Sequence, residues 1–348
     1  MQKFISKTKE LFSKTKEFLI NSRVKKLTVS WANRFKSKMK TFCKLPVFSK
    51  IKAFPAVLTT ALVSWWHLIL AGLVVFLVLY YPLGAFLTHT IDKDFEFNKQ
   101  NRQTNQTQIL DTAAALIDRE VNKHSWTPNL PFFYPSAVLD NMPAFQKGII
   151  AGLVSTVNAL TNGMPDAPFL KKAAESLQTD PTIWYFSQET PANKQYLAAR
   201  YYLHKAAQDI NNGAGIPSTA PAALLDAQIT GLDEVLDMLK TTLPVYNDSP
   251  LDAGADEIFY QAQGQAYVYY LVLRDLPVDF PELSANEAAM RFYNEALKTL
   301  KAALTFDPTI IRSAAPDSPY APNHPAVLGF YLSEVQNDLQ AMMRVLNK

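Results

Sequence analysis

The stretch of sequence that decides the fold is residues 55–87, PAVLTTALVSWWHLILAGLVVFLVLYYPLGAFL. The longer segment 53–91 contains no Asp, Glu, Lys or Arg. About 20 apolar residues in a helix cross the roughly 30 Å of hydrocarbon in a bilayer, whereas a buried core helix or a cleaved signal peptide has a shorter apolar run. We therefore predict one transmembrane helix near residues 58–81, ending close to Pro82, within the segment 55–91. The residues expected in the membrane or at its interfaces are Val57, Trp65, Trp66, Tyr80 and Tyr81.

The charges on the two sides of this apolar segment differ in sign. Residues 1–54 carry thirteen Lys and two Arg against two Glu, whereas the rest of the chain has nineteen basic and twenty-nine acidic side chains. Because positive flanks stay in the cytoplasm, we expect a cytoplasmic N-terminus and a larger C-terminal part on the other side. In a bacterium this describes a single-pass inner-membrane protein with a periplasmic domain. The single cysteine, Cys43, excludes an intramolecular disulfide and a zinc site built on several cysteines.

The basic segment, residues 1–54, begins with a near-repeat of seven residues, FISKTKE and then LFSKTKE, over 4–17. A seven-residue step almost completes two helical turns, so Phe4, Leu11 and Phe18 share one face. This pattern predicts a helix lying on the cytoplasmic leaflet, with a short coiled coil and nucleic-acid binding as alternatives. Because the neighbouring apolar segment already holds this region at a bilayer, we expect phospholipid as its partner and no nucleic acid. The lysines expected to contact anionic lipid are Lys7, Lys14, Lys25, Lys26, Lys44, Lys50 and Lys52.

The C-terminal part has the pattern of a helical domain. Residues 92–106 are polar and are expected to form a stalk, and residues 107–348 alternate helical apolar spacing with joints rich in Pro and Gly. We predict an all-α domain, either a multi-helix bundle or a short helical-repeat-like domain. Segment 287–308 resembles one helix of a tetratricopeptide unit, but no second copy follows at a period of about 34 residues. Helices are expected at 107–123, 143–161, 168–178, 191–211, 221–242, 254–275, 285–305 and 325–346.

The usual sequence signatures of catalysis and cofactor binding are missing. The chain contains no HExxH, no GxSxG, no GxxxxGK and no Rossmann glycine pattern. Outside the apolar segment, no two histidines lie at the spacing of metal ligands. We therefore predict no catalytic residue, no metal site and no cofactor.

Two loops, 132–146 and 317–325, are candidates for a partner surface or for the wall of a groove. The first reads FFYPSAVLDNMPAFQ and the second DSPYAPNHP. The alternative for their polar residues is a role in turns and helix caps. A general base at His324 would need a nucleophile, and none is visible beside it. The candidate surface residues are Phe132, Phe133, Tyr134, Asp140, Asn141, Asn323 and His324.

Three blocks of the chain resemble an uncharacterised family of bacterial single-span envelope proteins, a domain of unknown function. The blocks are LIDREVNKHSWTPNLPFFYPSAVLDNMPAFQKGI (116–149), DEIFYQAQGQAYVYYLVLRDLPVDF (256–280) and PDSPYAPNHPAVLGFYL (316–332). With the apolar segment they cover most of residues 60–348, and the basic head is not part of the resemblance. The resemblance implies a proteobacterial inner-membrane location and a helical periplasmic domain, but no reaction and no catalytic residue.

These observations favour a non-enzymatic scaffold or accessory subunit that binds another envelope protein through its helical domain. One alternative is an envelope hydrolase in which Asp140, Asp256 or His324 converge on one pocket. The other is a lipid- or peptide-binding groove lined by residues 132–134 and by Tyr269.

Overall fold

The computed structural model describes residues 46–99, 107–241, 253–315, 318–319 and 321–347. The predicted interfacial helix of the basic head, with Lys7, Lys14, Lys25, Lys26 and Lys44, lies outside the described residues, as do the side chains of Lys50, Lys52 and Val57. The chain divides into two compact units, residues 1–77 and 78–348.

The first described helix, α3 (Pro46–Thr88), contains the apolar segment. Its residues Trp65–Thr88 are long and apolar enough to cross a membrane, and almost none of them is buried. The helix continues past Pro82 and ends at Thr88, later than the sequence predicts. A proline removes one backbone donor from a helix, but flanking turns that remain intact allow the helix to continue through it.

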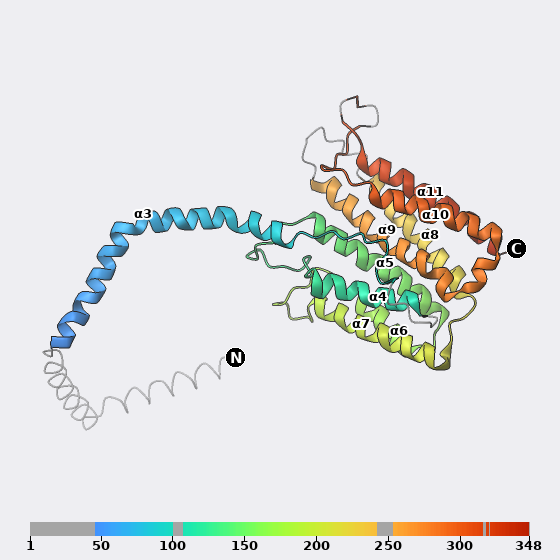
Figure 1. Ribbon diagram of the computed structural model, residues 1–348, viewed down its shortest axis with the longest axis horizontal. Helices are drawn as coiled ribbons and strands as arrows, with labels where there is room; N and C mark the ends of the chain where they lie inside the picture. Colours follow the sequence, from blue (N-terminus) through green and yellow to red (C-terminus); the bar gives the residue numbers. More distant parts are fainter. Residues whose placement is uncertain (1–45, 100–106, 242–252, 316–317, 320, 348) are drawn as a thin grey trace, which may run out of the picture. The chain divides into compact units, whose positions relative to one another are not determined.

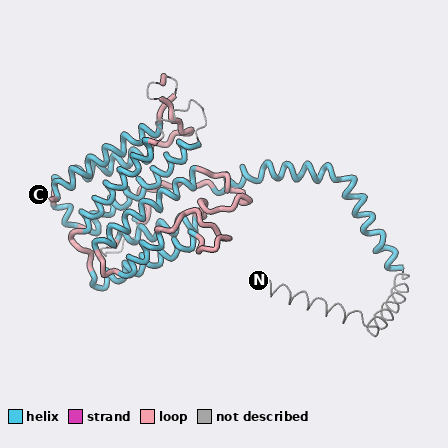
Figure 2. The backbone as a smooth tube through the Cα atoms, turned by 180° about the vertical axis from the view of Figure 1, so that it is seen from behind, coloured by secondary structure: helices cyan, strands magenta, loops and turns pink. Residues whose placement is uncertain are grey.

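The second unit is an all-α bundle, which confirms the predicted fold class, and Figure 2 shows helices and loops throughout the described residues. All eight helices predicted from apolar spacing are present. Short π- or 3-10 segments follow α4, α7 and α9. The helices are α4 (Gln108–Asp118), α5 (Asn141–Gly163), α6 (Pro168–Leu177), α7 (Ala192–Asp209), α8 (Ala220–Lys240), α9 (Ala253–Asp279), α10 (Glu287–Thr305) and α11 (His324–Leu346).

Helices α5 and α9 form the middle of the bundle. Helices α4, α6 and α7 lie on one side of this pair, and α8, α10 and α11 lie on the other (Figure 1). Every residue of α9 from 262 to 276 is buried, although this stretch contains Gln, Arg and Asp as well as apolar residues. A helix that is buried all round must find partners for its polar groups inside the protein.

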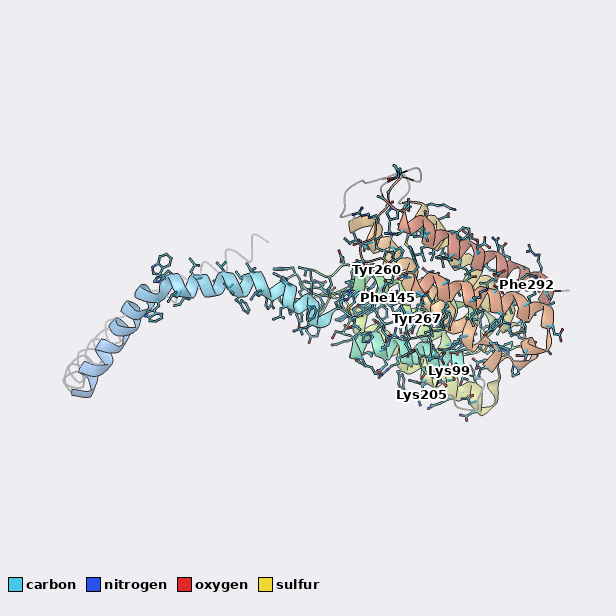
Figure 3. All side chains as sticks on the ribbon, turned by 45° about the horizontal axis from the view of Figure 1, so that its top comes forward. Lys99, Phe145, Lys205, Tyr260, Tyr267 and Phe292 are labelled. Atoms are coloured by element: carbon cyan, nitrogen blue, oxygen red, sulfur yellow. The ribbon has the colours of Figure 1, made fainter. Side chains whose placement is uncertain are left out.

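Glycines allow α5 and α9 to approach each other closely. A Cβ at Gly148 would overlap the carbonyl oxygen of Gln261, and a Cβ at Gly264 would overlap the carbonyl oxygen of Phe145. Figure 3 labels Phe145 of α5 and Tyr267 of α9, whose ring centroids lie 6.2 Å apart beside this contact. The backbones of the two central helices therefore pack directly on each other, as they do where small residues line a helix crossing.

The segment that follows α3 is bound to the bundle by buried arginines. The Arg119 guanidinium donates to the carbonyl oxygen of Asp92 at 3.0 Å and to the Tyr267 hydroxyl at 3.1 Å. Tyr267 in turn donates to the carbonyl oxygen of Asp94 at 2.7 Å, and Arg274 of α9 donates to that of Phe95 at 2.9 Å. The described part of the predicted stalk, residues 92–99, thus lies along α4 and α9. The outer limits predicted for the stalk and the domain remain predictions.

The N-terminus of α4 is capped by a carboxylate from α9. Asp279 accepts the backbone N–H groups of Gln108 and Ile109 at 2.7 and 2.9 Å. Burial of this carboxyl raises the pKa of Asp279 to about 6, although the two N–H groups act in the opposite direction. The end of α9 therefore fixes the start of α4 through a group that titrates near neutral pH.

Candidate functional site

The predicted surface residues Phe132, Phe133 and Tyr134 are exposed and lie against the C-terminal end of α3. The Tyr80 hydroxyl donates to the carbonyl oxygen of Phe133, and the Tyr81 hydroxyl donates to that of Phe132, both at 3.0 Å. At Gly84 a Cβ would overlap Pro135. This loop is therefore fixed to α3 by two hydrogen bonds and one close backbone contact.

The polar residues of the two predicted loops serve at helix starts. The Asp140 carboxylate accepts the N–H of Asn141 at 2.8 Å at the start of α5. The Asn323 side chain accepts the N–H of Ala326 at 2.9 Å and caps α11. These contacts match the capping alternative that the sequence leaves open.

His324 is held by the backbone of its own loop. Its Nδ1 accepts the N–H of Arg312 at 3.0 Å, and its ring meets the edge of Phe306 at 5.8 Å between centroids. Burial, and to a smaller degree the charge of Arg312, lowers the pKa of His324. A neutral imidazole with one nitrogen engaged by the backbone fits a structural role, which is to close the 312–324 loop.

The acidic residues named for a hydrolase lie near one tyrosine. Burial, and then the charges of Asp307, Asp256 and Asp140, raises the pKa of Tyr260 to about 12. A phenol with a raised pKa stays protonated at neutral pH, so it is a poor nucleophile or base. No group of three or more His, Cys, Asp or Glu side chains that could hold a metal ion occurs among the described residues.

A second exposed aromatic loop, Trp184, Tyr185 and Phe186, lies beside the first. The Trp126 indole N–H donates to the carbonyl oxygen of Pro181 at 3.0 Å, and the Asn129 amide donates to that of Ile183 at 2.9 Å. Trp126 and Asn129 precede residues 132–134, so these hydrogen bonds join the two loops. Sequence reasoning missed this second loop. Its signal is the same as that of the first: an uncharged aromatic run between prolines.

A cavity of about 860 Å³ is a groove between α5 and α8 that is closed at one side by residues 177–181. We call it the α5–α8 groove. Apolar side chains line it beside polar ones such as Asn158 and Thr230, and the Ser155 hydroxyl, which donates to the carbonyl oxygen of Ala227 at 3.2 Å, bridges the two helices within it. The apolar lining residues are Ile150, Ala151, Val154, Ala159, Ala223 and Ala227.

The rim of the α5–α8 groove is acidic. Asp180, Asp226 and Glu234 line it and are exposed. Lys147 lies on the same rim, but its ammonium group is 2.8 Å from the carboxylate of Glu257. Because the one lysine in the lining is paired, the groove presents net negative charge beside its apolar side chains, and a ligand with basic and apolar groups would be complementary to it.

Tyr269, which the sequence analysis placed in a groove wall, is fully buried. Its hydroxyl packs against Gly231, where a Cβ would overlap it, and accepts from the Gln265 amide at 2.8 Å. Tyr269 therefore supports α8 from beneath the groove instead of facing a ligand. That part of the lipid- or peptide-groove interpretation is wrong, because the helical face of Tyr269 points to the neighbouring helix.

Two smaller cavities flank α7. One, about 620 Å³, is polar and contains an ion pair between Arg200 and Asp118, with His204 on its wall. Burial raises the pKa of Asp111 in the same cavity, against the smaller effect of His204. The other, about 310 Å³, lies among α6, the end of α7 and Gly215. None of the three cavities is lined by Asp140, Asp256 or His324.

Comparisons of the chain with protein-family models, with curated proteins and with solved structures found no match in any of the three.

Proposed function

We propose that the chain is a single-span bacterial inner-membrane protein with a cytoplasmic N-terminus, and that its helical domain is a non-enzymatic scaffold that binds another envelope protein. The observation that carries the binding role is the α5–α8 groove, an open groove of about 860 Å³ lined by apolar and polar side chains and by three carboxylates. This volume falls within the range of roughly 300–1,000 Å³ that ligand-binding sites occupy.

The membrane part of the proposal is supported by exposure as well as by composition. The large apolar side chains of α3 from Trp65 to Leu79 are exposed, and Leu77 is one of them. Contiguous apolar surface of this extent is not stable in water and marks contact with lipid or protein. The thirteen Lys and two Arg of residues 1–54 support the proposed orientation, as does the resemblance to bacterial single-span envelope proteins.

The groove itself suggests the chemistry of its partner. An amphipathic helix places apolar side chains at every third or fourth position, and these would lie on Ala151, Val154 and Ala227. Lys or Arg on the flanks of that helix would face Asp226 and Glu234 across the rim. We therefore propose that the partner presents a basic amphipathic segment.

A photocrosslinking residue at Val154 in the full chain, in its native membrane, tests this proposal. We expect one defined crosslinked product that disappears when Asp226→Lys and Glu234→Lys are added. The matched controls are the same photocrosslinker at Val327 of α11 and the double change Glu282→Lys with Glu334→Lys, all at exposed positions outside the groove. Equal crosslinking at Val154 and Val327, or a product that survives the groove charge reversal, would contradict a partner in this groove.

The orientation is tested separately with a single cysteine. In a Cys43→Ser background, Phe330→Cys places the thiol at an exposed position of α11. We expect a membrane-impermeant maleimide to label this thiol in intact cells whose outer membrane has been permeabilised. Labelling that occurs only after lysis would place the domain in the cytoplasm.

A further inference from the structure

The two aromatic loops, defined as residues 132–138 and 184–186, form an exposed apolar surface on the bundle. Phe132 is 81% exposed, Tyr185 65% and Phe186 66%. Phe133, Tyr134, Val138 and Trp184 are exposed as well. A surface that gathers so many large aromatic side chains in two neighbouring loops marks an interaction site.

The position of the first loop on α3 fixes its depth relative to the apolar helix. Tyr80 and Tyr81, whose hydroxyls bind its carbonyl oxygens, lie inside the stretch Trp65–Thr88 that is apolar enough to cross a membrane. At 1.5 Å per residue, the seven residues from Tyr81 to Thr88 rise about 10 Å. The backbone of Phe132 therefore lies about 10 Å short of the end of this apolar stretch, level with residues that the bilayer would cover.

The second loop is at the same end of the bundle. Figure 2 shows loop segments gathered at the end next to the C-terminal residues of α3. The hydrogen bonds from Trp126 to Pro181 and from Asn129 to Ile183 hold the two loops together. Both loops thus lie at the end of the bundle that carries the C-terminal residues of α3.

The base of the first loop is rigid. Gln146 of α5 is fully buried, and its side-chain oxygen accepts from the backbone N–H and the hydroxyl of Thr127 at 3.0 and 2.7 Å. The Gln146 amide also donates to the carbonyl oxygen of Ser125 at 3.0 Å. The chain that leads into the aromatic residues is therefore fixed to the central helix, so their exposure is not the result of an unanchored loop.

The composition of the loops suits the interface of a bilayer. Residues 129–139 and 181–188 contain no Asp, Glu, Lys or Arg, and the nearest charges are Asp140, Asp180 and Glu189. Trp and Tyr are favoured at the headgroup level because their apolar rings carry one polar edge, and Phe is favoured on faces that are buried at the acyl boundary. A polar partner protein would leave this surface without matching charge.

We infer that the two aromatic loops enter the leaflet that surrounds the C-terminal end of α3, so that the helical domain rests on the bilayer through a second contact besides its span. This inference rests on the proposed membrane function. The occupant of the surface is phospholipid, and its aromatic side chains lie among the headgroups and the first acyl carbons.

The test uses the full chain with Cys43→Ser and one new cysteine, labelled with an environment-sensitive fluorophore, in phosphatidylcholine nanodiscs. The discs are prepared without a quencher, or with a lipid that carries a nitroxide either near the headgroup end of its acyl chain or near the terminal methyl. The positions are Tyr185→Cys in the second loop, Leu77→Cys in α3, and Phe330→Cys of α11, which is 64% exposed and so matches Tyr185 in exposure.

We expect the labels at 185 and 77 to emit at shorter wavelength. The label at 185 should lose most of its fluorescence with the shallow quencher and the label at 77 with the deep one, whereas the label at 330 stays unquenched by both. If the label at 77 is quenched and the label at 185 behaves like that at 330, the span is real and the loop inference is wrong. If neither label is quenched, the proposed membrane function fails and the inference fails with it. The last outcome compares discs that hold one chain with discs that hold two. If the label at 185 is quenched in the first and unquenched in the second, the surface belongs to a dimer and the lipid contact is overturned.

Discussion

Helices α3 and α9 are the two longest in the described chain, and their side chains have opposite surroundings. Between Trp65 and Leu79, α3 exposes nearly every large apolar side chain, whereas residues 262–276 of α9 are all buried although several are polar. An apolar helix without protein around it needs lipid, and a polar helix surrounded by protein needs hydrogen-bond partners. The comparison shows that the surroundings of a helix decide which composition is stable, so each helix can be tested by giving it a residue suited to the other.

The largest effect is expected from Arg119, the buried arginine that directly follows α4 and donates a hydrogen bond to Tyr267 of α9. In Arg119→Met the buried Glu120 carboxylate, whose oxygen lies 2.8 Å from the Arg119 guanidinium, would keep only the His124 ring and the Gln146 amide as partners, and Tyr267 would lose one contact. We expect the free energy of unfolding to fall by about 3–5 kcal/mol, the usual effect of breaking a buried ion pair. Chemical denaturation of the full chain in detergent micelles, followed by circular dichroism, measures this.

The control for Arg119→Met is Arg291→Met, because Arg291 is exposed on α10. We expect this control to change stability by less than about 0.5 kcal/mol, as most surface substitutions do. Equal stability of the two variants would show that the buried charges around α9 contribute little.

The reciprocal experiment places a charge in α3. Leu77→Arg puts a guanidinium near the middle of the stretch Trp65–Thr88, at a cost of about 2.5–3.5 kcal/mol for insertion. We expect a larger share of the protein to leave the membrane fraction on alkaline extraction. The change Phe330→Arg on exposed α11 should leave that share unchanged. Extraction of the unchanged chain to the same extent as Leu77→Arg would mean that α3 is not held by hydrocarbon.

The pH dependence of stability tests the buried carboxyl of Asp279 at the end of α9. The folded state holds the Asp279 proton up to about pH 6, whereas the unfolded carboxyl releases it near its ordinary value of 3.8. Between these values the folded state binds more protons, so stability falls as pH rises from about 4 to about 6, by at most about 3 kcal/mol for this group.

The measurement for Asp279 is a series of denaturation curves from pH 4 to pH 7 for the wild type and for Asp279→Asn. We expect the variant to lose the part of the slope that Asp279 contributes, whatever the other carboxyls do. Parallel curves would mean that the Asp279 carboxylate is as well solvated in the folded domain as in the unfolded chain.

The smallest effect is expected from adding one methyl group where α9 touches α5. In Gly264→Ala the new Cβ would overlap the carbonyl oxygen of Phe145, and because this is backbone, the helices would have to separate. We expect a loss of about 1–3 kcal/mol in the free energy of unfolding. Gly163→Ala is the control, because a Cβ there meets no atom within 4 Å and alanine favours the helix. Similar stability of both variants would show that the α5–α9 contact is looser than described.

The positions of the helices could be predicted because each has an apolar stripe on one face and Pro or Gly at its ends. The burial of α9 on all sides could not, because the partners of its polar residues come from distant parts of the chain: Gln263 donates to Phe306, and Arg274 to Phe95. No local pattern records such pairings. The exception within α9 is Gly264, since a small residue in a helix is a recognisable signal of close packing.

The candidate surfaces also differ in whether the sequence alone could predict them. The loop with Phe132 was predictable as a surface from its uncharged aromatic run, and the loop with Tyr185 carries the same signal. The α5–α8 groove was not predictable, because residues that line it, such as Val154 and Ala227, are far apart in sequence and ordinary in their own helices. The capping contacts of Asn323 were predictable from its place directly before a helix.

The short connection after α3 sets how far from the lipid the domain can act. Only three residues separate Thr88 from Asp92, whose carbonyl oxygen is bound by Arg119, so this connection extends by at most about 14 Å. The longest helix of the bundle, α9, has 27 residues and is therefore about 40 Å long. In the membrane arrangement proposed above, a binding protein that stays farther from the bilayer than roughly one such helix length would be out of reach, and only components anchored in, or lying close to, that membrane could be captured.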